Sequence, residues 1–293
     1  MPARLGLPAR SVLNACDIIA AMPMPPSRLI TTRLDTHDAE VLIATQPDLK
    51  FAPHWHEQWS VGAVAKGVCR FACDGAMFEA HAGDVIVMRP RAVHTAGTSA
   101  RLFEMAMLYL PPDWVGDAMG WPRGLLPLHA TTVQHDARLS DALCAAAHSR
   151  RVNDIRASVT QALAQAVPRD LALVQAPAIE PRVRALCEAL QRDGETADMS
   201  ALAREAGLSR EHFHRLFRKT IGLTPLDYAR LARMSRAKRL LLQGASASHA
   251  ALDCGFADQA HFSRWFKRYF GVTPAAYGPL LDFGVDRTEP AAH

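Results

Sequence analysis

The sequence has no long uninterrupted apolar run and few aromatic residues. Aromatic residues make up 7% of the 293 positions, although 49% are hydrophobic, which is enough to bury a sizeable core. No segment approaches the roughly 20 consecutive apolar residues that a membrane-spanning helix needs. The N-terminus also lacks the ordered basic flank, apolar stretch and small-residue cleavage site of a secretory signal. These absences predict a cytoplasmic protein with no membrane partner.

Cysteine is scarce and has no framework spacing. Scattered cysteines in a chain of this length are typical of buried thiols rather than of disulfides. Cys69 and Cys73 alternate with apolar residues in a segment expected to be a strand, and metal or redox use of this pair is the less favoured alternative. The six cysteines are Cys16, Cys69, Cys73, Cys144, Cys187 and Cys254.

The net charge of the whole chain is small, but the positive charge is concentrated in one part of it. The whole chain has 33 Lys and Arg against 29 Asp and Glu, a net charge of +4. Residues 178–280 carry 16 basic and 10 acidic residues, whereas residues 1–177 carry 16 of each. A basic part joined to a neutral part suggests that only one half meets a polyanion. Basic helices are also common for solubility, so charge alone does not decide the question.

The first half of the chain consists of three segments with different patterns. Prolines within residues 1–30 predict a flexible lead-in, in which Met22 and Met24 are alternative start sites. Short runs with a period near two, broken by glycine, predict a small antiparallel barrel or sandwich over residues 31–112. Alanine and leucine at helical spacing over residues 113–177 predict a helical connector that can also serve dimerisation.

The second half is predicted to be helical after a short proline linker, "PAIEP". Helices begin at proline, aspartate or serine and end at glycine, as helix punctuation requires. The helical part is expected to span residues 178–280, and an acidic tail follows over residues 281–293.

The helical half contains an internal repeat. The segment "ALAREAGLSREHFHRLFRKTIGLTPLDY" aligns with "AALDCGFADQAHFSRWFKRYFGVTPAAY" at an offset of 48 and then 49 residues. Self-similarity of this kind indicates a repeated structural unit. The matched pairs include Gly207 with Gly255, Phe213 with Phe262, Arg215 with Arg264, Phe217 with Phe266 and Tyr228 with Tyr277.

Each copy is expected to be a short helix, a glycine turn and a second helix. This is a helix-turn-helix, whose second helix can lie in the major groove of DNA. The two units are predicted at about residues 198–220 and 246–270. Aromatic residues form one face of each second helix, and the other face carries an arginine at the same point, Arg215 and Arg264. Solvated charge is the common explanation for such a face, but its recurrence in a basic domain favours double-stranded DNA.

Residues 181–280 resemble the DNA-binding domain of the AraC/XylS family of bacterial transcription regulators. The segment "CGFADQAHFSRWFKRYFGVTPAAY" matches the second-motif signature of that family. The resemblance implies two helix-turn-helix units joined by a long helix, here about Pro225–Gln243, with both recognition helices on one face of DNA. Two departures are Ala260, where the family often has a polar residue, and Gly278, where it usually has a basic one.

The resemblance also implies which residues contact DNA. Arginine suits guanine and glutamine suits adenine, whereas Lys219 and Lys267 are expected on phosphates. The implied DNA-binding residues are Glu211, His214, Arg215, Arg218, Lys219, Gln259, His261, Ser263, Arg264 and Lys267.

Three histidines are the chemically distinctive residues of the first half. "PHWHEQW" and "GDVIVMRPRAVH" resemble the two motifs of the cupin barrel, in which His54 and His56 point the same way from a strand. The residues predicted to line an effector pocket are His54, Trp55, His56, Trp59 and His94. A metal site of His54, His56 and His94 is an alternative, as are purely structural histidines. The cupin pattern places a glutamate where Trp59 or Ser60 stands here, so no cofactor is expected.

Together these patterns predict an α+β multidomain protein. It has an N-terminal cupin-like antiparallel β-barrel, a helical connector and a C-terminal all-α domain with two helix-turn-helix motifs. The expected function is a DNA-binding regulator, an activator by the commoner role in that family, whose barrel senses a small molecule and which is not an enzyme. Its expected partners are double-stranded DNA, a small-molecule effector, a second copy of the chain and, for an activator, RNA polymerase. Alternatives are a cupin-type metal-dependent enzyme and an effector-independent regulator.

Overall fold

The structure of the chain is a computed structural model. It describes residues 28–35, 37–45, 50–98, 103–127, 131–168, 171–175, 180–193 and 197–277. Residues 1–27 of the expected lead-in, with its two alternative start sites, lie outside the described residues, as does the acidic tail over 281–293.

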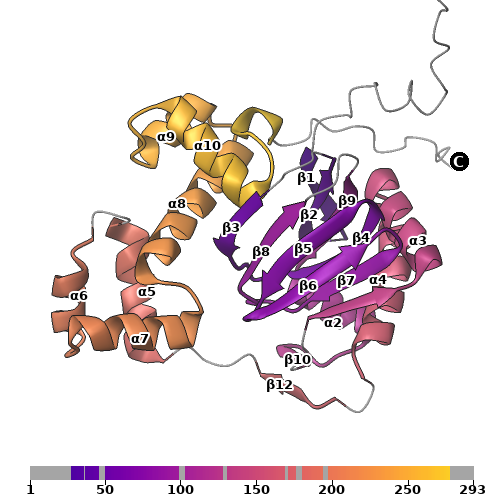
Figure 1. The fold of residues 1–293 in the computed structure, drawn as a ribbon, viewed down its shortest axis with the longest axis horizontal. Coiled ribbons are helices and arrows are strands. Elements are labelled where there is room, and N and C mark those ends of the chain that lie inside the picture. Colours follow the sequence, from indigo (N-terminus) through magenta and orange to yellow (C-terminus); the bar gives the residue numbers. More distant parts are fainter. Residues whose placement is uncertain are drawn as a thin grey trace, which may run out of the picture.

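The N-terminal part consists of two antiparallel sheets that pack against each other (Figure 1). The first has six strands, in the order β1 (Arg28–Leu34), β2 (His37–Ala44), β9 (Glu104–Leu110), β4 (Trp59–Lys66), β7 (Asp84–Met88) and β11 (Thr132–His135). The second has four, in the order β3 (Lys50–His54), β8 (His94–Thr98), β5 (Val68–Cys73) and β6 (Ala76–His81). The predicted antiparallel β-fold is confirmed, as two hydrogen-bonded sheets rather than one closed ring among the described strands.

Both faces of the central strands are covered. Every residue of β7 is buried, because one face meets the second sheet and the other meets helices α3 (Ala137–Ser149) and α4 (Val152–Ala166). The inner face contributes Ile86 to one hydrophobic core, and the outer face contributes Val85 to a second core under α3 and α4. Neighbouring residues of one strand therefore belong to different cores.

The structure differs from the expected chain division at two places. Strand β1 begins at Arg28, inside the segment expected to be a flexible lead-in, because its backbone pairs with β2 from Arg28 to Leu34. The expected helical connector over 113–177 also contains strands. Its β11 pairs with β7 and completes the six-stranded sheet. The connector also includes helix α2 (Pro112–Met119) and a short pair of strands, β10 (Leu125–Pro127) and β12 (Leu173–Gln175).

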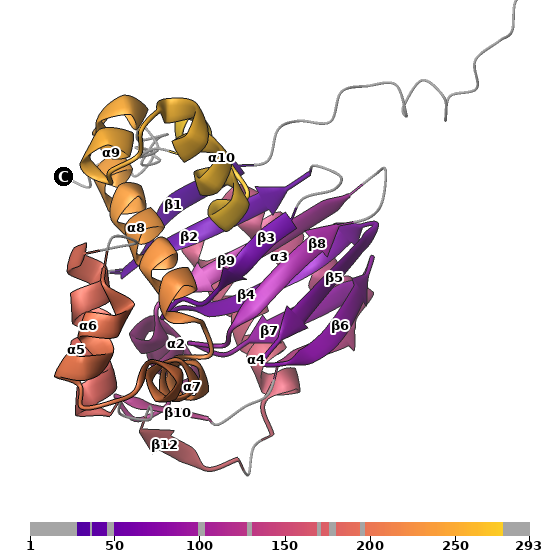
Figure 2. The same cartoon turned by 60° about the vertical axis from the view of Figure 1, so that its left-hand side comes forward.

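The C-terminal domain is helical, as predicted. Its elements are α5 (Pro181–Asp193), α6 (Met199–Glu205), α7 (Arg210–Ile221), α8 (Pro225–Leu242), α9 (Ala247–Asp253), α10 (Gln259–Phe270) and a 3₁₀ turn, η2 (Pro274–Ala276). Helices α6 and α7 form one helix-turn-helix, and α9 and α10 form the other, at the two ends of α8 (Figure 2).

The two units are built with the same local devices. Ser209 caps α7 and Asp258 caps α10, each by accepting from the backbone N–H three residues on. The turn between the helices of each unit needs a left-handed residue, supplied by Gly207 at φ +68° and Gly255 at φ +70°. The N–H after each glycine bonds back across the turn at 2.9 Å, from Leu208 to Ala203 and from Phe256 to Ala251. The sequence repeat is therefore a structural repeat.

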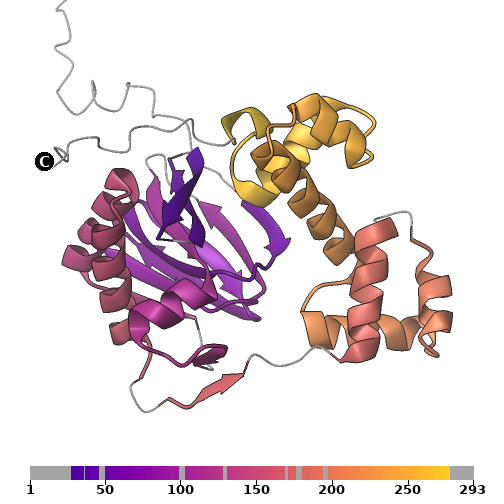
Figure 3. The same ribbon diagram turned by 180° about the vertical axis from the view of Figure 1, so that it is seen from behind.

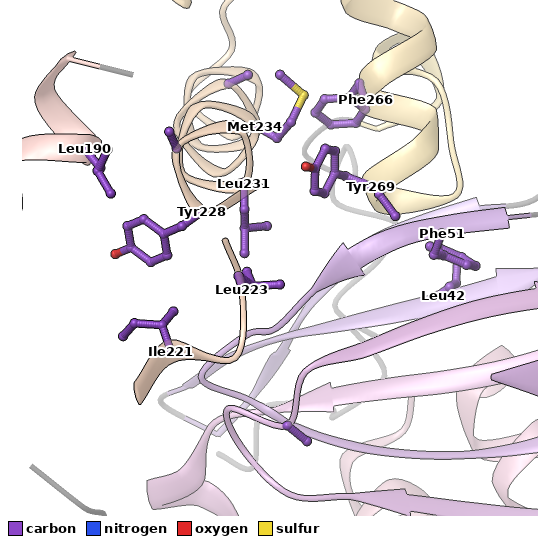
Figure 4. Packing of buried hydrophobic residues seen from close by; sticks show 14 of the residues in the cluster. Leu42, Phe51, Leu190, Ile221, Leu223, Tyr228, Leu231, Met234, Phe266 and Tyr269 are labelled. Carbon is purple, nitrogen blue, oxygen red and sulfur yellow. The ribbon is translucent and has the colours of Figure 1, made fainter. Parts of the chain in front are cut away.

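The barrel and the helical domain are in contact. The side of α8 and the end of α10 face β3 (Figures 2 and 3), and Gly222, which ends α7, lies against Val93 of the barrel. The aromatic rings of Trp55 and Tyr228 are 6.3 Å apart between their centroids across this interface. Met234 of α8 packs with Phe266 and Tyr269 of α10 (Figure 4). One hydrophobic core thus continues from the barrel interior into the helical domain.

The described helices include none that is both long enough and apolar enough to traverse a bilayer.

Candidate nucleic-acid interface and ligand site

The polar faces of α7 and α10 lie on the surface. Phe213, Phe217, Phe262 and Phe266 are fully buried, which turns the opposite side of each helix outward. Of the ten residues predicted to contact DNA, His214, Ser263 and Lys267 are half-buried and the other seven are exposed: Glu211, Arg215, Arg218, Lys219, Gln259, His261 and Arg264. The geometry is that of two recognition helices, each with a polar face available to a groove.

The cations of these two faces differ from those of α8. On α8, Arg236 pairs with Asp253 at 2.7 Å, and the Arg233 guanidinium donates to backbone carbonyls of Cys254 and Gly255. Within the described part of the chain, no ion pair joins the predicted contacts Arg215 and Arg264 to a carboxylate. The same holds for Arg218, Lys219 and Lys267. Structural cations are thus used internally, while those of the recognition faces stay available for phosphates and bases.

His261 is oriented by its own helix. Its Nε2 accepts a hydrogen bond from Nε1 of Trp265 at 2.8 Å, and its ring lies edge-on to Phe256. Because Nε2 is occupied, the other ring nitrogen, Nδ1, is the one left to face a partner.

The three histidines of the barrel converge at its mouth. His54 ends β3 and His94 begins β8, and the two are directly paired in register. Their ring centroids are 4.3 Å apart, and that of His56 is 5.2 Å from His94. Each ring offers a nitrogen within 4.8 Å of the other two. The prediction that His54 and His56 face the same way is confirmed.

The Nδ1–H of each ring is tied to the backbone. His54 donates to the carbonyl of Ala52 at 2.7 Å, His56 to Gln58 at 3.0 Å and His94 to Ala92 at 2.8 Å. A carbonyl oxygen only accepts, so Nδ1 carries the proton and Nε2 carries the lone pair.

The environment keeps these rings neutral. Burial, with the charges of His94 and Lys238 adding to it, lowers the pKa of His54 to about 3. Burial likewise lowers the pKa of His56 and of His94.

The structure separates the two tryptophans predicted for the pocket. Trp55 lies beside the histidines on the wall that faces α8. Trp59 does not line this site, so its assignment there was wrong. It is fully buried in the core under α3 and α4, because it pairs with Leu110 on the outer face of the sheet, whereas Ser60 pairs with Tyr109 on the inner face.

A cavity large enough for a ligand lies between the domains. The interior of the barrel holds about 30 Å³ of free space, the size of a single water. Beside its mouth, a cavity of about 640 Å³ is lined by both halves of the chain, within the range of small-molecule sites. The barrel contributes Glu40, His54, Trp55, His56, Glu57, Gln58 and Tyr109, and the helical domain contributes Gln191, Tyr228, Leu231, Ala232, Ser235, Lys238, Arg239, Leu242, Tyr269 and Phe270.

A buried carboxylate joins the two halves at this cavity. Oε2 of Glu40, on β2, accepts from Nζ of Lys238, on α8, at 2.5 Å. Oε1 of Glu40 accepts from the hydroxyl of Tyr277 at 3.0 Å. These three side chains form an interdomain latch that holds both the linker helix and the end of the second helix-turn-helix unit to the barrel.

Comparison with known proteins agrees with this geometry. Residues 202–278 match the model of a helix-turn-helix domain, and residues 36–159 match that of the AraC-like ligand binding domain. Together the two matches cover more than half of the chain. The two matches, an AraC-like ligand-binding domain followed by a helix-turn-helix domain, support an AraC-family transcriptional regulator.

Individual relatives are similar to this chain over most of its length. The uncharacterised HTH-type transcriptional regulator YbfI of Bacillus subtilis (strain 168) is 27% identical over 223 residues, 72% of this chain and 81% of that protein. The crystal structure of ToxT from Vibrio cholerae O395 is similar in fold, with a TM-score of 0.54 and 10% identity over 82% of this chain and 96% of ToxT. ToxT from strain SCE256 with an unsaturated fatty acid bound has a TM-score of 0.53 and 12% identity, over 84% of this chain and 96% of that one.

Sequence reasoning missed the latch between the two domains. Lys238 is one of several cations on α8, and its partner Glu40 lies 198 residues earlier in the chain. One local signal existed, because Glu40 is followed directly by the apolar run "VLIA" in a strand. A buried carboxylate requires a partner, although the sequence does not say which.

Proposed function

We propose that the effector of this ligand-sensing, DNA-binding regulator binds in the cavity between the barrel and α8. The observation that carries the proposal is the cavity itself, whose walls come from both domains. A molecule bound there contacts the sensor and the DNA-binding half at once. It changes DNA affinity to the extent that it binds two docking arrangements of the domains differently.

The effector class follows from the lining of the cavity. Trp55, Leu231 and Phe270 supply apolar surface, and the cations Lys238 and Arg239 lie on α8. Arg239 is exposed and has no ion-pair partner among the described residues. An amphipathic anion, with a carboxylate and an apolar body, fits this combination.

The latch can couple binding of such an anion to the position of the DNA-binding domain. A carboxylate on Lys238 competes with Glu40, and a displaced Glu40 weakens its hold on Tyr277 as well. Because Tyr277 follows α10 through the turn η2, effector binding would loosen the second helix-turn-helix unit from the barrel. The free energy available for this response is the difference in effector affinity between the latched and unlatched forms.

The DNA contacts are assigned by position on the recognition faces. Arg215 and Arg264 read bases, with Glu211, His214, Gln259, His261 and Ser263 as their neighbours on the same faces, while Arg218, Lys219 and Lys267 hold phosphates. Two such units at the ends of one rigid helix place their recognition helices in successive grooves of one duplex.

Activation, dimerisation and contact with RNA polymerase are part of the same proposal. The outward faces of α3 and α4 offer small alanines among polar residues, including Ala142, Ala145 and Ala157, against which a second copy can pack. Analytical ultracentrifugation at micromolar concentration should therefore detect a dimer. In vitro transcription from a mapped promoter should rise when the regulator is added.

The effector proposal is tested on DNA that the protein selects itself. Genome-wide mapping of bound DNA supplies a target site, and fluorescence anisotropy measures its affinity with and without a panel of straight-chain and aromatic carboxylic acids. Alcohols of the same carbon skeleton are the matched ligands that lack the charge. At least one acid should shift DNA affinity by fivefold or more, while its alcohol does not.

A pair of variants locates the response. Lys238→Met should abolish the effect of the acid, whereas Arg236→Met removes an equal charge from the same helix, outside the cavity lining, and should preserve it. An acid response that survives Lys238→Met, or the absence of any response across the panel, contradicts the proposed site and effector class.

A further inference from the structure

Two of the three histidines at the mouth of the barrel have an Nε2 lone pair that accepts no hydrogen bond in the described part of the structure. In the described part of the structure, Nε2 of His54 and Nε2 of His94 accept no hydrogen bond, and Nε2 of His56 faces the hydroxyl of Ser60 at 3.2 Å. His54 and His94 are at most 7% exposed, so few water molecules can reach their rings. Two buried imidazoles therefore present lone pairs that accept no hydrogen bond, next to the half-buried ring of His56, and a bound cation could take all three lone pairs.

We propose that His54, His56 and His94 hold a divalent transition-metal ion of the zinc, nickel or copper type through their Nε2 atoms. Imidazole nitrogen is the ligand these ions share, and hard oxygen-seeking ions such as magnesium and calcium are disfavoured by a set without a carboxylate.

The spacing of the nitrogens is close to that of a metal site. Nitrogens that bind one zinc ion at about 2.0–2.1 Å in tetrahedral geometry stand about 3.4 Å apart. The ring nitrogens of the three histidines lie within 4.8 Å of one another. Side-chain movements of about 1 Å close the remaining gap, while β3 and β8 hold the rings in register through the pair His54–His94.

The hydrogen bonds behind the rings are those of ligating histidines. Each Nδ1–H donates to a backbone carbonyl, which fixes the tautomer with Nε2 free and holds the plane of the ring. The same feature on all three residues, at Ala52, Gln58 and Ala92, is a built set rather than one accidental contact.

The ion would have an open coordination position. No carboxylate belongs to the described cluster, and Glu40, on the same cavity wall, is held by Lys238 and Tyr277. His54 and His56 both border the interdomain cavity. Catalytic and ligand-binding metal sites keep three protein ligands and one open position in this way, so the remaining position faces the space where the effector is proposed to bind.

Lys238 provides a directional test of this geometry. Its positive charge is close enough to act on His54 and His56, and it neutralises Glu40. Removing it in Lys238→Met takes a cation away from the site and frees a carboxylate beside it. Metal affinity should therefore rise several-fold, although the same change is expected to abolish the effector response.

The experiment titrates the full-length, untagged protein, stripped with a chelator, with Zn²⁺ and with Co²⁺. One ion per chain should bind with a dissociation constant below about 1 μM. Co²⁺ should give the visible absorption bands of a four-coordinate site. The midpoint of thermal unfolding should rise with Zn²⁺ concentration, as mass action requires. His56→Gln and His94→Gln should each weaken binding by at least a hundredfold, and His148→Gln, an exposed histidine on α3, should leave it unchanged.

A second variant keeps the test independent of folding defects. Ser60→Ala removes the donor to Nε2 of His56 and should bind metal at least as tightly as the native chain. Binding weaker than about 100 μM in the native chain, or equal binding in His94→Gln, overturns the metal site. If metal fails to bind while an acid still changes DNA affinity through Lys238, the metal site is wrong and the proposed function stands. If metal binds but no acid changes DNA affinity, the metal site stands and the proposed effector class is wrong.

Discussion

Arg264 is the residue on which base recognition by the second unit most depends. It is exposed, occupies the same position in α10 as Arg215 in α7, and has no ion-pair partner among the described residues. Arg264→Ala should weaken binding to a mapped site by about 1–3 kcal/mol and relax the sequence preference at the base pairs that Arg264 contacts. Fluorescence anisotropy on matched and mutated sites measures both. Arg138→Ala, an equal charge change on α3, is the control, and the same loss in both variants would mean that Arg264 acts only through net charge.

The buried histidines make stability depend on pH in a stated direction. His54 has a folded pKa of about 3, below its unfolded value of about 6.5, so the unfolded chain binds the proton first. Stability is complete above pH 6.5 and falls as the pH drops from 6.5 towards 3, by up to about 1.4 kcal/mol per pH unit for this group.

Urea unfolding at pH 7.5, 6.0 and 5.0 measures the effect. The His54→Asn variant should lose less stability between pH 7.5 and 5.0 than the native chain, because it lacks the group that gains the proton. Identical pH slopes in the two proteins would show that His54 titrates normally in the folded state.

Single residues also mark where sequence reasoning reached its limit. The sequence placed His54 and His56 on one side correctly, although β3 ends at His54 and His56 lies just beyond it. Alternation could not place Trp59, since the chain leaves the strand after His54 and the count restarts at β4. Only the pairing with Leu110 shows that this ring faces the outer core.

At the scale of elements, the end of α7 is a contact with the barrel as well as a helix terminus. Gly222 has φ +82°, and a Cβ there would stand 2.5 Å from Cγ2 of Val93. Gly222→Ala should therefore lower the free energy of unfolding through two effects. The left-handed conformation costs about 1–2 kcal/mol, and the clash with Val93 adds a further amount. Gly207→Ala is the matched variant, because φ is +68° and nothing lies within 4 Å of the added methyl.

Chemical unfolding separates the two contributions. Gly222→Ala should destabilise more than Gly207→Ala, and Val93→Ala introduced with Gly222→Ala should recover part of the difference by making room. Equal losses for the two glycine variants would indicate that α7 does not rest against the barrel in solution.

Elements were predictable where local chemistry defines them. Both helix-turn-helix units follow from their serine, aspartate and glycine punctuation, and the structure realises each cap and turn in both copies. Strand β11 was not predicted, because four residues, "TVQH", carry too little pattern and are strand only through pairing with β7. Alanine-rich surroundings made the same segment look helical.

At the scale of the molecule, the latch decides how the two domains sit. Glu40 is 11% and Lys238 is 19% exposed at the side chain, so each is expensive to leave alone. No local pattern could predict this contact between residues 198 apart, since it exists only once both domains have folded and docked. The sequence was enough to identify both domains, but it did not predict how they dock against each other.

A double-mutant cycle measures that relation. Glu40→Gln and Lys238→Met each leave one charge without its partner at a mostly buried site, and each should destabilise the chain by about 2–4 kcal/mol. The double variant removes both charges and should lose less than the sum, with a coupling of at least 1 kcal/mol. The cycle is measured by urea unfolding at pH 7.5 and repeated in 1 M NaCl, where a buried pair is screened less than a surface pair. Additivity within about 0.5 kcal/mol would mean that the domains are not latched in the free protein, and an effector could not then act by releasing Glu40.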